Sequence, residues 1–342
     1  MATTKVTTDG IDMSGNTGGL TWVKGTTAQQ PSGALGELRV DTDAKRVAVY
    51  TDETGTSEWR YLKEEAGTFS LDFLVVAGGG AGGSGTGLAG GGGAGGLRTS
   101  FGSATGGGVT PAESTKTLTV GQAYDIIVGP GGSASSSSVR GNNGTNSKFD
   151  DIESTGGGGG GYSSNGSDQD GKLGGSGGGA GGASIRSGSG GLGTSGQGFA
   201  GGAASAGGGS GPYQVGGGGG AAGPGSPSTT YNGSTGAGLG QDVEITGSVV
   251  TYAAGGLPNQ GTPIDGGAYT GKGGSGDGSG GSSGAGGSGV VILRCSRASA
   301  TLGSGLIVNS TTGPGSVSGV AIGGTSDYYY TATSGSGTIT FN

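Results

Sequence analysis

The stretch FLVVAGGGAGGSGTGLAGGGGAGGLRTSFG, residues 73–102, decides the fold of this protein. It begins as an apolar run, which predicts a buried β-strand, and passes after Ala77 into a tract dominated by glycine. The spacing of Gly78, Gly80 and Gly83 also matches G-x-G-x-x-G, the pattern of a dinucleotide-binding turn. The stretch therefore has two interpretations, a nucleotide site and a glycine scaffold.

The dinucleotide interpretation fails on the residues around the pattern. Such a site needs a helix directly after the glycines and an acidic residue about 20 positions further on. Here more glycine follows, and residues 78–112 contain neither Asp nor Glu. Two partial phosphate-loop patterns, GSDQDGKL at 166–173 and GGAYTGKG at 266–273, lack the hydroxyl residue that binds Mg²⁺. We interpret all three patterns as by-products of abundant glycine.

The composition excludes several classes of protein. Glycine accounts for 96 of 342 residues, roughly four times its usual share. Only 29% of the residues are hydrophobic, which favours several small apolar layers over one large core. The net charge of −7, without any Lys/Arg cluster, argues against a nucleic-acid partner. No pattern of a signal peptide or a membrane span is visible, so neither is expected.

The residue types that carry catalysis are scarce. The chain has no histidine, and its one cysteine, Cys295, lies in the strand-like run VVILRCS, which predicts a buried thiol. Asp168, Asp170 and Asp277 lack the spacing of a calcium loop. The acidic run FDDIES at 149–154 is typical of an edge strand that carries charges against aggregation. We therefore expect no catalytic residue, no metal site and no cofactor, and we expect that the protein is not an enzyme.

The pattern of apolar residues predicts an all-β chain of three domains. Residues 1–66 alternate apolar and polar positions around the turn DTDAK, which predicts a small β-hairpin module that packs on another element or on other copies of itself. Residues 67–296 are a glycine-rich domain, and residues 297–342 read as four short strands of a small C-terminal β unit. Strand-like islands inside the glycine-rich domain are 67–77, 115–129, 147–154, 242–254 and 289–296.

Three states are open to the glycine tract itself. A glycine/serine linker is a flexible coil, and collagen needs glycine at every third residue, a period that this tract breaks at once. The third state is a bundle of extended polyproline-II segments, whose free N–H and C=O groups pair with neighbouring segments. Well-placed strands and isolated leucines favour the packed bundle over the disordered linker. In such a bundle alanine, serine and leucine are expected at the edges.

Large side chains cannot lie between closely packed glycine segments, so aromatic residues of the tract are expected at loop ends or outer faces. Tyrosine combines a large ring with a hydroxyl group, which suits contacts with sugars and proteins. Packing against the strands is the alternative role. Four tyrosines are the candidate residues of a contact surface: Tyr162, Tyr213, Tyr231 and Tyr269.

Two regions resemble bacteriophage proteins. WVKGTTAQQPSGALGELRVDTDAKRVAVYTDETGTSEWRYL at 22–62 is similar to a module near the N-termini of tail fibres and other virion appendages. GTFSLDFLVVAGGGAGG at 67–83, followed in order by YDIIVGPGG, NNGTNSKFD, STGGGGGG and GGSGVVILR, resembles the glycine-rich domain of tail fibres and adhesins, frequently from phages of marine bacteria. One adhesin group in that family forms a sandwich of polyproline-II helices whose loops bind the receptor.

The resemblance implies a structural, receptor-binding virion protein, usually a homotrimer, assembled in the host cytoplasm. It implies attachment to other virion proteins through residues 1–66 and contact with a surface polysaccharide or outer-membrane protein of the host. Two alternatives remain open. One is a capsid decoration or head-fibre protein, and the other, from a different class, is a secreted ice-binding or matrix protein.

Overall fold

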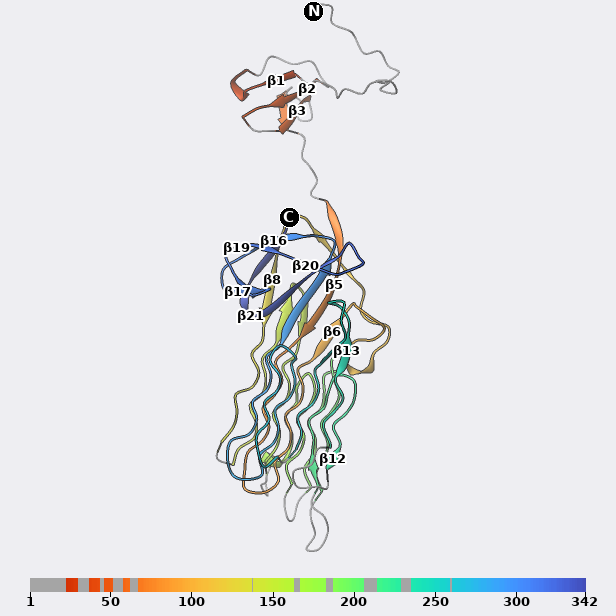
Figure 1. Cartoon of the computed structure of the whole chain (residues 1–342), viewed down its shortest axis with the longest axis vertical. Helices are drawn as coiled ribbons and strands as arrows, with labels where there is room; N and C mark the ends of the chain where they lie inside the picture. The colour runs from red at the N-terminus through yellow and green to blue at the C-terminus, as the bar shows by residue number, and fades with distance from the viewer. Residues whose placement is uncertain are drawn as a thin grey trace, which may run out of the picture. The chain divides into compact units, whose positions relative to one another are not determined.

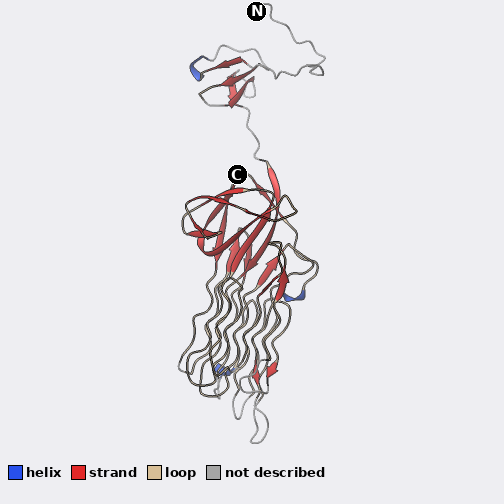
Figure 2. Cartoon of the chain, viewed as in Figure 1, coloured by secondary structure: helices blue, strands red, loops and turns tan. Residues whose placement is uncertain are grey.

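The computed structural model describes residues 23–29, 37–43, 46–51, 58–61, 67–136, 138–162, 167–182, 187–205, 214–228, 235–258 and 260–342. The chain divides into two compact units, residues 1–65 and residues 66–342. The described residues form strands, extended segments and 3₁₀ turns but no α-helix, which confirms the expected all-β class (Figure 2). The 3₁₀ turns are η1 (Thr27–Gln29), η2 (Gly106–Gly108) and η3 (Ser167–Gln169).

The first unit is a sheet in the order β1-β2-β3-β4. Its strands are β1 (Val23–Gly25), β2 (Leu38–Asp41), β3 (Arg46–Thr51) and β4 (Glu58–Tyr61). Strands β2 and β3 form the expected hairpin, in which Val40 lies opposite Val47, and β1 joins β2 in parallel. Arg39 is only 2% exposed; its guanidinium group donates to the Thr26 carbonyl and lies over the Trp59 ring.

The second unit is built on a 13-stranded antiparallel sheet whose central path is β10-β9-β8-β21-β15-β5-β6 (Figure 1). The strands of this path are β5 (Thr68–Val76), β6 (Leu97–Thr99), β8 (Ala123–Val128), β9 (Ser147–Phe149), β10 (Ile152–Ser154), β15 (Val290–Cys295) and β21 (Tyr328–Phe341). Strands that pair beside it are β7 (Lys116–Thr119), β16 (Ser299–Leu302), β17 (Leu306–Val308), β18 (Thr311–Thr312), β19 (Gly315–Ser318) and β20 (Val320–Ala321).

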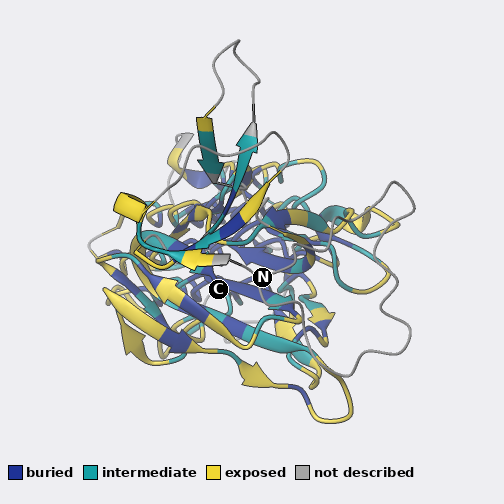
Figure 3. Ribbon diagram, turned by 90° about the horizontal axis from the view of Figure 1, so that it is seen from above, coloured by how far each residue is buried: buried dark blue, intermediate teal, exposed yellow. Residues whose placement is uncertain are grey.

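The apolar half of β5, residues 73–76, and strand β15 are buried on both faces, which suits their continuous apolar runs. Phe73 and Val75 of β5 belong to one hydrophobic cluster, and Leu74 and Val76, which point to the other face, belong to a second. Residues of β15 alternate between the same two clusters. Seen from above, buried segments occupy the middle of the unit and exposed ones its rim (Figure 3). These two strands therefore join the two apolar layers of the unit.

Residues 297–342 do not form a sheet of their own. The first part of strand β21, residues 328–332, pairs with β15, and its last part, residues 335–340, pairs with β8. Strands β16, β17 and β20 also pair with β21, so it lies in the middle of the main sheet. Tyr330 and Phe341 of β21 pack edge to face, with ring centroids 5.3 Å apart, inside the cluster that contains Phe73. The strands expected as a separate C-terminal unit thus complete the sheet that β5 begins.

Two short hairpins lie outside the main sheet. They are formed by β11 (Val215–Gly216) with β12 (Pro227–Ser228) and by β13 (Gln241–Val243) with β14 (Val250–Tyr252). Val243 and Tyr252 pack with Leu74 and Val76 in the second hydrophobic cluster, so the β13–β14 hairpin covers that face of the sheet.

The glycine tract forms a packed bundle of extended segments, here called the glycine bundle. It comprises the described residues of 77–97, 129–146, 155–162, 167–182, 187–205, 214–228, 235–240 and 253–289. In Figure 1 these segments run side by side below the sheet, without regular strands along most of their length. The packed state is therefore the observed one.

Hydrogen bonds in the glycine bundle follow a period of three residues. Along segment 77–87, successive amides donate to three different neighbours, and each partner segment recurs at every third residue, at N···O distances of 2.8–3.1 Å. This is the periodicity of a polyproline-II helix, which has three residues per turn and no internal hydrogen bonds. The donor–acceptor pairs are Ala77–Gly96, Gly80–Gly93 and Gly83–Gly90; Gly78–Thr145, Ala81–Asn142 and Ser84–Val139; and Gly79–Gly287 and Gly82–Gly284.

Carbonyl groups complete the packing around the same segment. The oxygens of Gly78, Gly79 and Gly80 accept from the amides of Gly157, Gly132 and Gly274, which belong to three further segments. The ranges 129–146 and 253–289 each contribute two of these partner segments, so segment 77–87 has six hydrogen-bonded neighbours. Because backbones approach on every side, a Cβ atom added at Gly92, Gly177 or Gly218 would overlap a backbone carbonyl oxygen of the next segment.

Some alanines lie inside the glycine bundle, where the sequence pattern placed alanine at the edges. Ala81, Ala89, Ala94 and Ala180 are fully buried. The methyl group of Ala180 lies opposite Gly188, and Ala94 packs into the second hydrophobic cluster. A methyl group is thus accommodated where the facing residue is glycine or where the segment borders the apolar face of the sheet. The leucines Leu173, Leu192 and Leu239 are exposed, as expected for edges.

Hydrogen exchange should report this packing directly. We expect the amides of 77–97 and 175–182 to exchange at least about a thousandfold more slowly than in an unstructured glycine peptide, because each opening breaks bonds to several segments. Exchange followed by mass spectrometry measures this, with the same chain in denaturant as the reference. Random-coil rates in these segments would contradict the packed bundle.

A methyl group at a crowded glycine should unfold the bundle. We expect Gly218→Ala to lower the free energy of unfolding by about 3 kcal/mol or more, because the new Cβ meets the backbone of Gly92, which cannot move independently. The control is Gly323→Ala, where no atom lies within 4 Å of the added Cβ, and a change within about 0.5 kcal/mol is expected. Denaturant unfolding compares the two variants, and equal midpoints would contradict the prediction.

Candidate functional site

The bundle has two ends, one at the sheet and one away from it, here called the sheet end and the loop end. Described residues of the loop end are 84–88, 138–140, 162, 167–169, 278–281 and the hairpin β11–β12, of which β12 is labelled in Figure 1. Isolated bridges join its turns: Ser84 pairs with Val139 and Asp277, and Thr86 pairs with Ser279. The turns of the loop end are therefore held together by backbone pairing.

The structure places two of the four candidate tyrosines at opposite ends. Tyr162 is half-buried at the loop end, where its amide donates to the Asp168 carbonyl. Tyr269 is 49% exposed at the sheet end, where its amide donates to the Ser288 hydroxyl. Segment 155–162 runs between these ends, and eight polyproline-II residues span about 25 Å. Tyr213 and Tyr231 lie outside the described residues.

A cavity of about 350 Å³ lies beside Tyr162. Three segments form it: the first contributes Ser138, Val139 and Arg140, the second Tyr162, and the third Asp168 and Lys172. Their neighbours in the bundle fix them, because the amides of Gly141 and Lys172 donate to the carbonyls of Gly160 and Gly159 in the Tyr162 segment.

Two cations meet one carboxylate at this cavity, whereas the whole chain carries a net charge of −7. Within the described residues neither Arg140 nor Lys172 forms a salt bridge, and the buried Nε of Arg140 has no hydrogen-bond partner. Burial, followed by the positive charge of Arg140, lowers the pKa of the Lys172 amine, and Asp168 offsets this only in part. The cavity therefore has unsatisfied capacity for an anion.

Asparagine side chains bind the segment that leads to this cavity. The Oδ1 atoms of Asn146 and Asn143 accept from the amides of Gly156 and Gly159, at 2.8 and 3.0 Å. Asn143 also donates from Nδ2 to the Leu173 carbonyl, at 3.3 Å, so it links the segment of Gly159 to the segment of Leu173. Gly156 and Gly159 are three residues apart, and Tyr162 is the next residue at this spacing.

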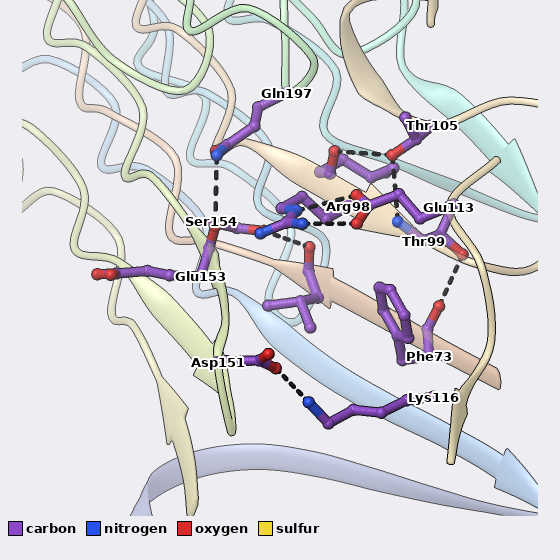
Figure 4. A network of polar contacts seen from close by, with 12 residues as sticks. Phe73, Arg98, Thr99, Thr105, Glu113, Lys116, Asp151, Glu153, Ser154 and Gln197 are labelled. Atoms are coloured by element: carbon purple, nitrogen blue, oxygen red, sulfur yellow. Dashed lines mark hydrogen bonds and ion pairs between the residues drawn. The ribbon is translucent and has the colours of Figure 1, made fainter. Parts of the chain in front are cut away.

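A second polar cluster lies in the sheet, close to where the glycine segments begin (Figure 4). Arg98 holds both oxygens of Glu113 through Nε and Nη2, at 2.9 and 2.6 Å, and Lys116 forms ion pairs with Asp150 and Asp151. The hydrogen bond from Lys116 lowers the pKa of Asp151. A general acid requires a raised pKa, so this carboxyl group is poorly suited to proton donation. The cluster ties strands together at the sheet end.

An apolar cavity, also of about 350 Å³, lies on the side of the bundle. Leu173 and Leu192, which are 65% and 67% exposed, flank Gly174 and Gly193, and Thr155 and Thr194 complete the lining. The Gly174 amide donates to the Leu192 carbonyl, so the two leucines belong to adjacent edge segments.

Sequence reasoning missed Arg140 and Lys172. Lys172 was considered only as part of the phosphate-loop pattern in 166–173, whose described residues, 167–173, form turn η3 and an extended segment. The available signal was the rarity of charge: these two residues are isolated cations in a tract of glycine, serine and alanine. Their proximity depends on the pairing of segments and is not visible in the sequence.

The described residues contain no group of three or more Asp, Glu, His or Cys side chains that could hold a metal ion. No helix among them is long and apolar enough to span a membrane. Cys295 is buried in β15, as its apolar surroundings predicted.

The model of a glycine-rich domain family matches residues 51–296 of this chain. The matched region runs from the end of β3 to the residue after β15 and contains the whole glycine bundle. No curated protein and no solved structure matches the chain.

The Cys295 thiol should be inert in the folded protein. Burial raises its pKa from an ordinary value near 9 to about 11, and only the thiolate reacts. We expect no alkylation by iodoacetamide at pH 8 and complete alkylation after unfolding, measured by mass spectrometry. Above pH 9 the unfolded thiol ionises while the folded thiol keeps its proton. The stability due to this group is therefore present below pH 9 and is lost between pH 9 and 11. Rapid labelling of the native chain would contradict the prediction.

Proposed function

This chain belongs to the glycine-rich domain family, and we propose that it is a structural protein of a bacteriophage tail fibre or adhesin whose loop end contacts the host cell. In this role the chain is part of the virion, recognises a surface receptor and performs no catalysis. The receptor is a surface polysaccharide or an outer-membrane protein of the host.

One observation carries the proposal: the bundle holds a set of turns far from the sheet, mainly by hydrogen bonds between backbones. The second unit begins and ends in the sheet, at Thr68 in β5 and near Phe341 in β21 (Figure 1). The loop end therefore contains neither terminus of this unit. Since segments with six bonded neighbours are difficult to bend, such a bundle suits the presentation of turns to another surface.

The remaining parts of the proposal concern assembly. Residues 1–66 attach the chain to other virion proteins, and three copies form a homotrimer. The four-stranded sheet of this unit leaves Leu38 37% exposed, which gives it an apolar side chain to bury on assembly. No nucleic acid or cofactor takes part.

A blocking experiment tests the role of the loop end. Thr86 at the loop end and Thr312 in the sheet are both exposed. Each is replaced by cysteine in a separate variant, and the new thiol is coupled to a polyethylene glycol maleimide. The fluorescent full chain is then incubated with a panel of marine bacterial strains and measured by flow cytometry. We expect saturable binding to some strains, reduced at least about tenfold by the Thr86 label and unchanged by the Thr312 label. Equal effects of the two labels would contradict recognition by the loop end.

A further inference from the structure

We propose that the cavity bounded by Arg140, Tyr162 and Lys172 binds an anionic sugar unit, one that carries a carboxylate or a phosphate group. The assignment of this sugar to a host-surface glycan rests on the proposed function. The binding chemistry itself is argued from the cavity.

The cations of the cavity call for an anion. Arg140 Nε is buried without a partner, and a buried donor that lacks an acceptor costs free energy that a bound anion would recover. A guanidinium group matches the planar arrangement of oxygens in a carboxylate or phosphate group, and Lys172 adds a second charge. Burial is the main cause of the lowered pKa of Lys172; the nearby positive charge of Arg140 adds to it, and Asp168 offsets it only in part.

The rest of the lining suits a sugar ring. The half-buried Tyr162 offers an aromatic face, and Val139, 44% exposed, offers an apolar edge for the C–H groups of the ring. Asp168 and Ser138 provide acceptors for sugar hydroxyl groups. A volume of about 350 Å³ lies at the lower end of the range for small-molecule sites.

The glycine bundle holds these groups in place before any ligand binds. The segments of Arg140 and Lys172 are bonded to consecutive carbonyls of the Tyr162 segment, those of Gly160 and Gly159, and the Asn143 side chain joins all three segments. A preformed site loses less conformational entropy on binding than a flexible one. The chain is net negative overall, so a single anionic group is favoured over an extended polyanion.

Sugar titrations of the purified full chain test the site. The probes are glucuronate, glucose 6-phosphate, neutral glucose and inorganic phosphate, followed by calorimetry or ligand-observed NMR. We expect the two acidic sugars to bind at least about tenfold more tightly than glucose, and glucose 6-phosphate to bind more tightly than inorganic phosphate. Equal binding of glucose and the acidic sugars would overturn the proposal. Equal binding of both phosphates would also overturn it, because it would indicate an anion site without recognition of the sugar.

Variants locate the binding. Arg140→Gln is expected to abolish the preference for acidic sugars, and Tyr162→Ala to weaken all sugars while leaving inorganic phosphate unchanged. The matched control is Lys148→Gln, which removes the same charge from β9 in the sheet, outside the cavity, and should change no affinity. Equal losses in Lys148→Gln and Arg140→Gln would overturn the assignment. Hydrogen exchange of each variant checks that the bundle remains folded.

The two proposals fail in different measurements. If the chain binds cells through its loop end but prefers no acidic sugar, the adhesin function is supported and the sugar site is contradicted. If the acidic sugars bind the cavity but the chain binds no cell, the sugar site stands and its assignment to a host glycan falls.

Discussion

Direct contact of polypeptide backbones on every side is the constraint on which this structure depends. A polyproline-II segment has no internal hydrogen bonds, so its amides and carbonyls must all find partners in neighbouring segments. Six neighbours can satisfy one segment only if no side chain separates them, and most central positions are accordingly glycine. Ordering glycine costs more conformational entropy than ordering any other residue, and dense hydrogen bonding compensates for this cost.

The first glycine segments of the bundle continue directly from strands of the sheet. Strands β5 and β15 are hydrogen-bonded neighbours, and Ala77 and Gly289, the residues that adjoin their paired ends, already belong to glycine segments. The two hydrophobic clusters on the faces of these strands provide the apolar burial that glycine cannot provide. Side-chain packing therefore sets the direction of the first segments, and backbone packing continues from them. The same division confines large or charged side chains to edges and ends, where the candidate site lies.

Much of the fold could be predicted from local patterns. Continuous apolar runs identified β5 and β15 as buried strands, and the glycine content excluded helices and favoured a packed scaffold. Local patterns did not predict how residues 297–342, expected as a separate domain, pair with the rest of the chain. The residues of β21 read correctly as β structure, but their pairing with β8 and β15 is a contact between distant parts of the chain.

For the candidate site, the amino-acid sequence determined which residue types were available: a few tyrosines and isolated cations in a tract almost free of other reactive groups. Only the tertiary structure decided that Tyr162 meets Arg140 and Lys172 at the loop end while Tyr269 lies at the sheet end. The physical reason is that glycine has no side chain to specify a partner. Register between glycine segments comes from the strands and turns at their ends. Two residues of the same type in the tract, such as Tyr162 and Tyr269, can therefore lie at opposite ends of the bundle.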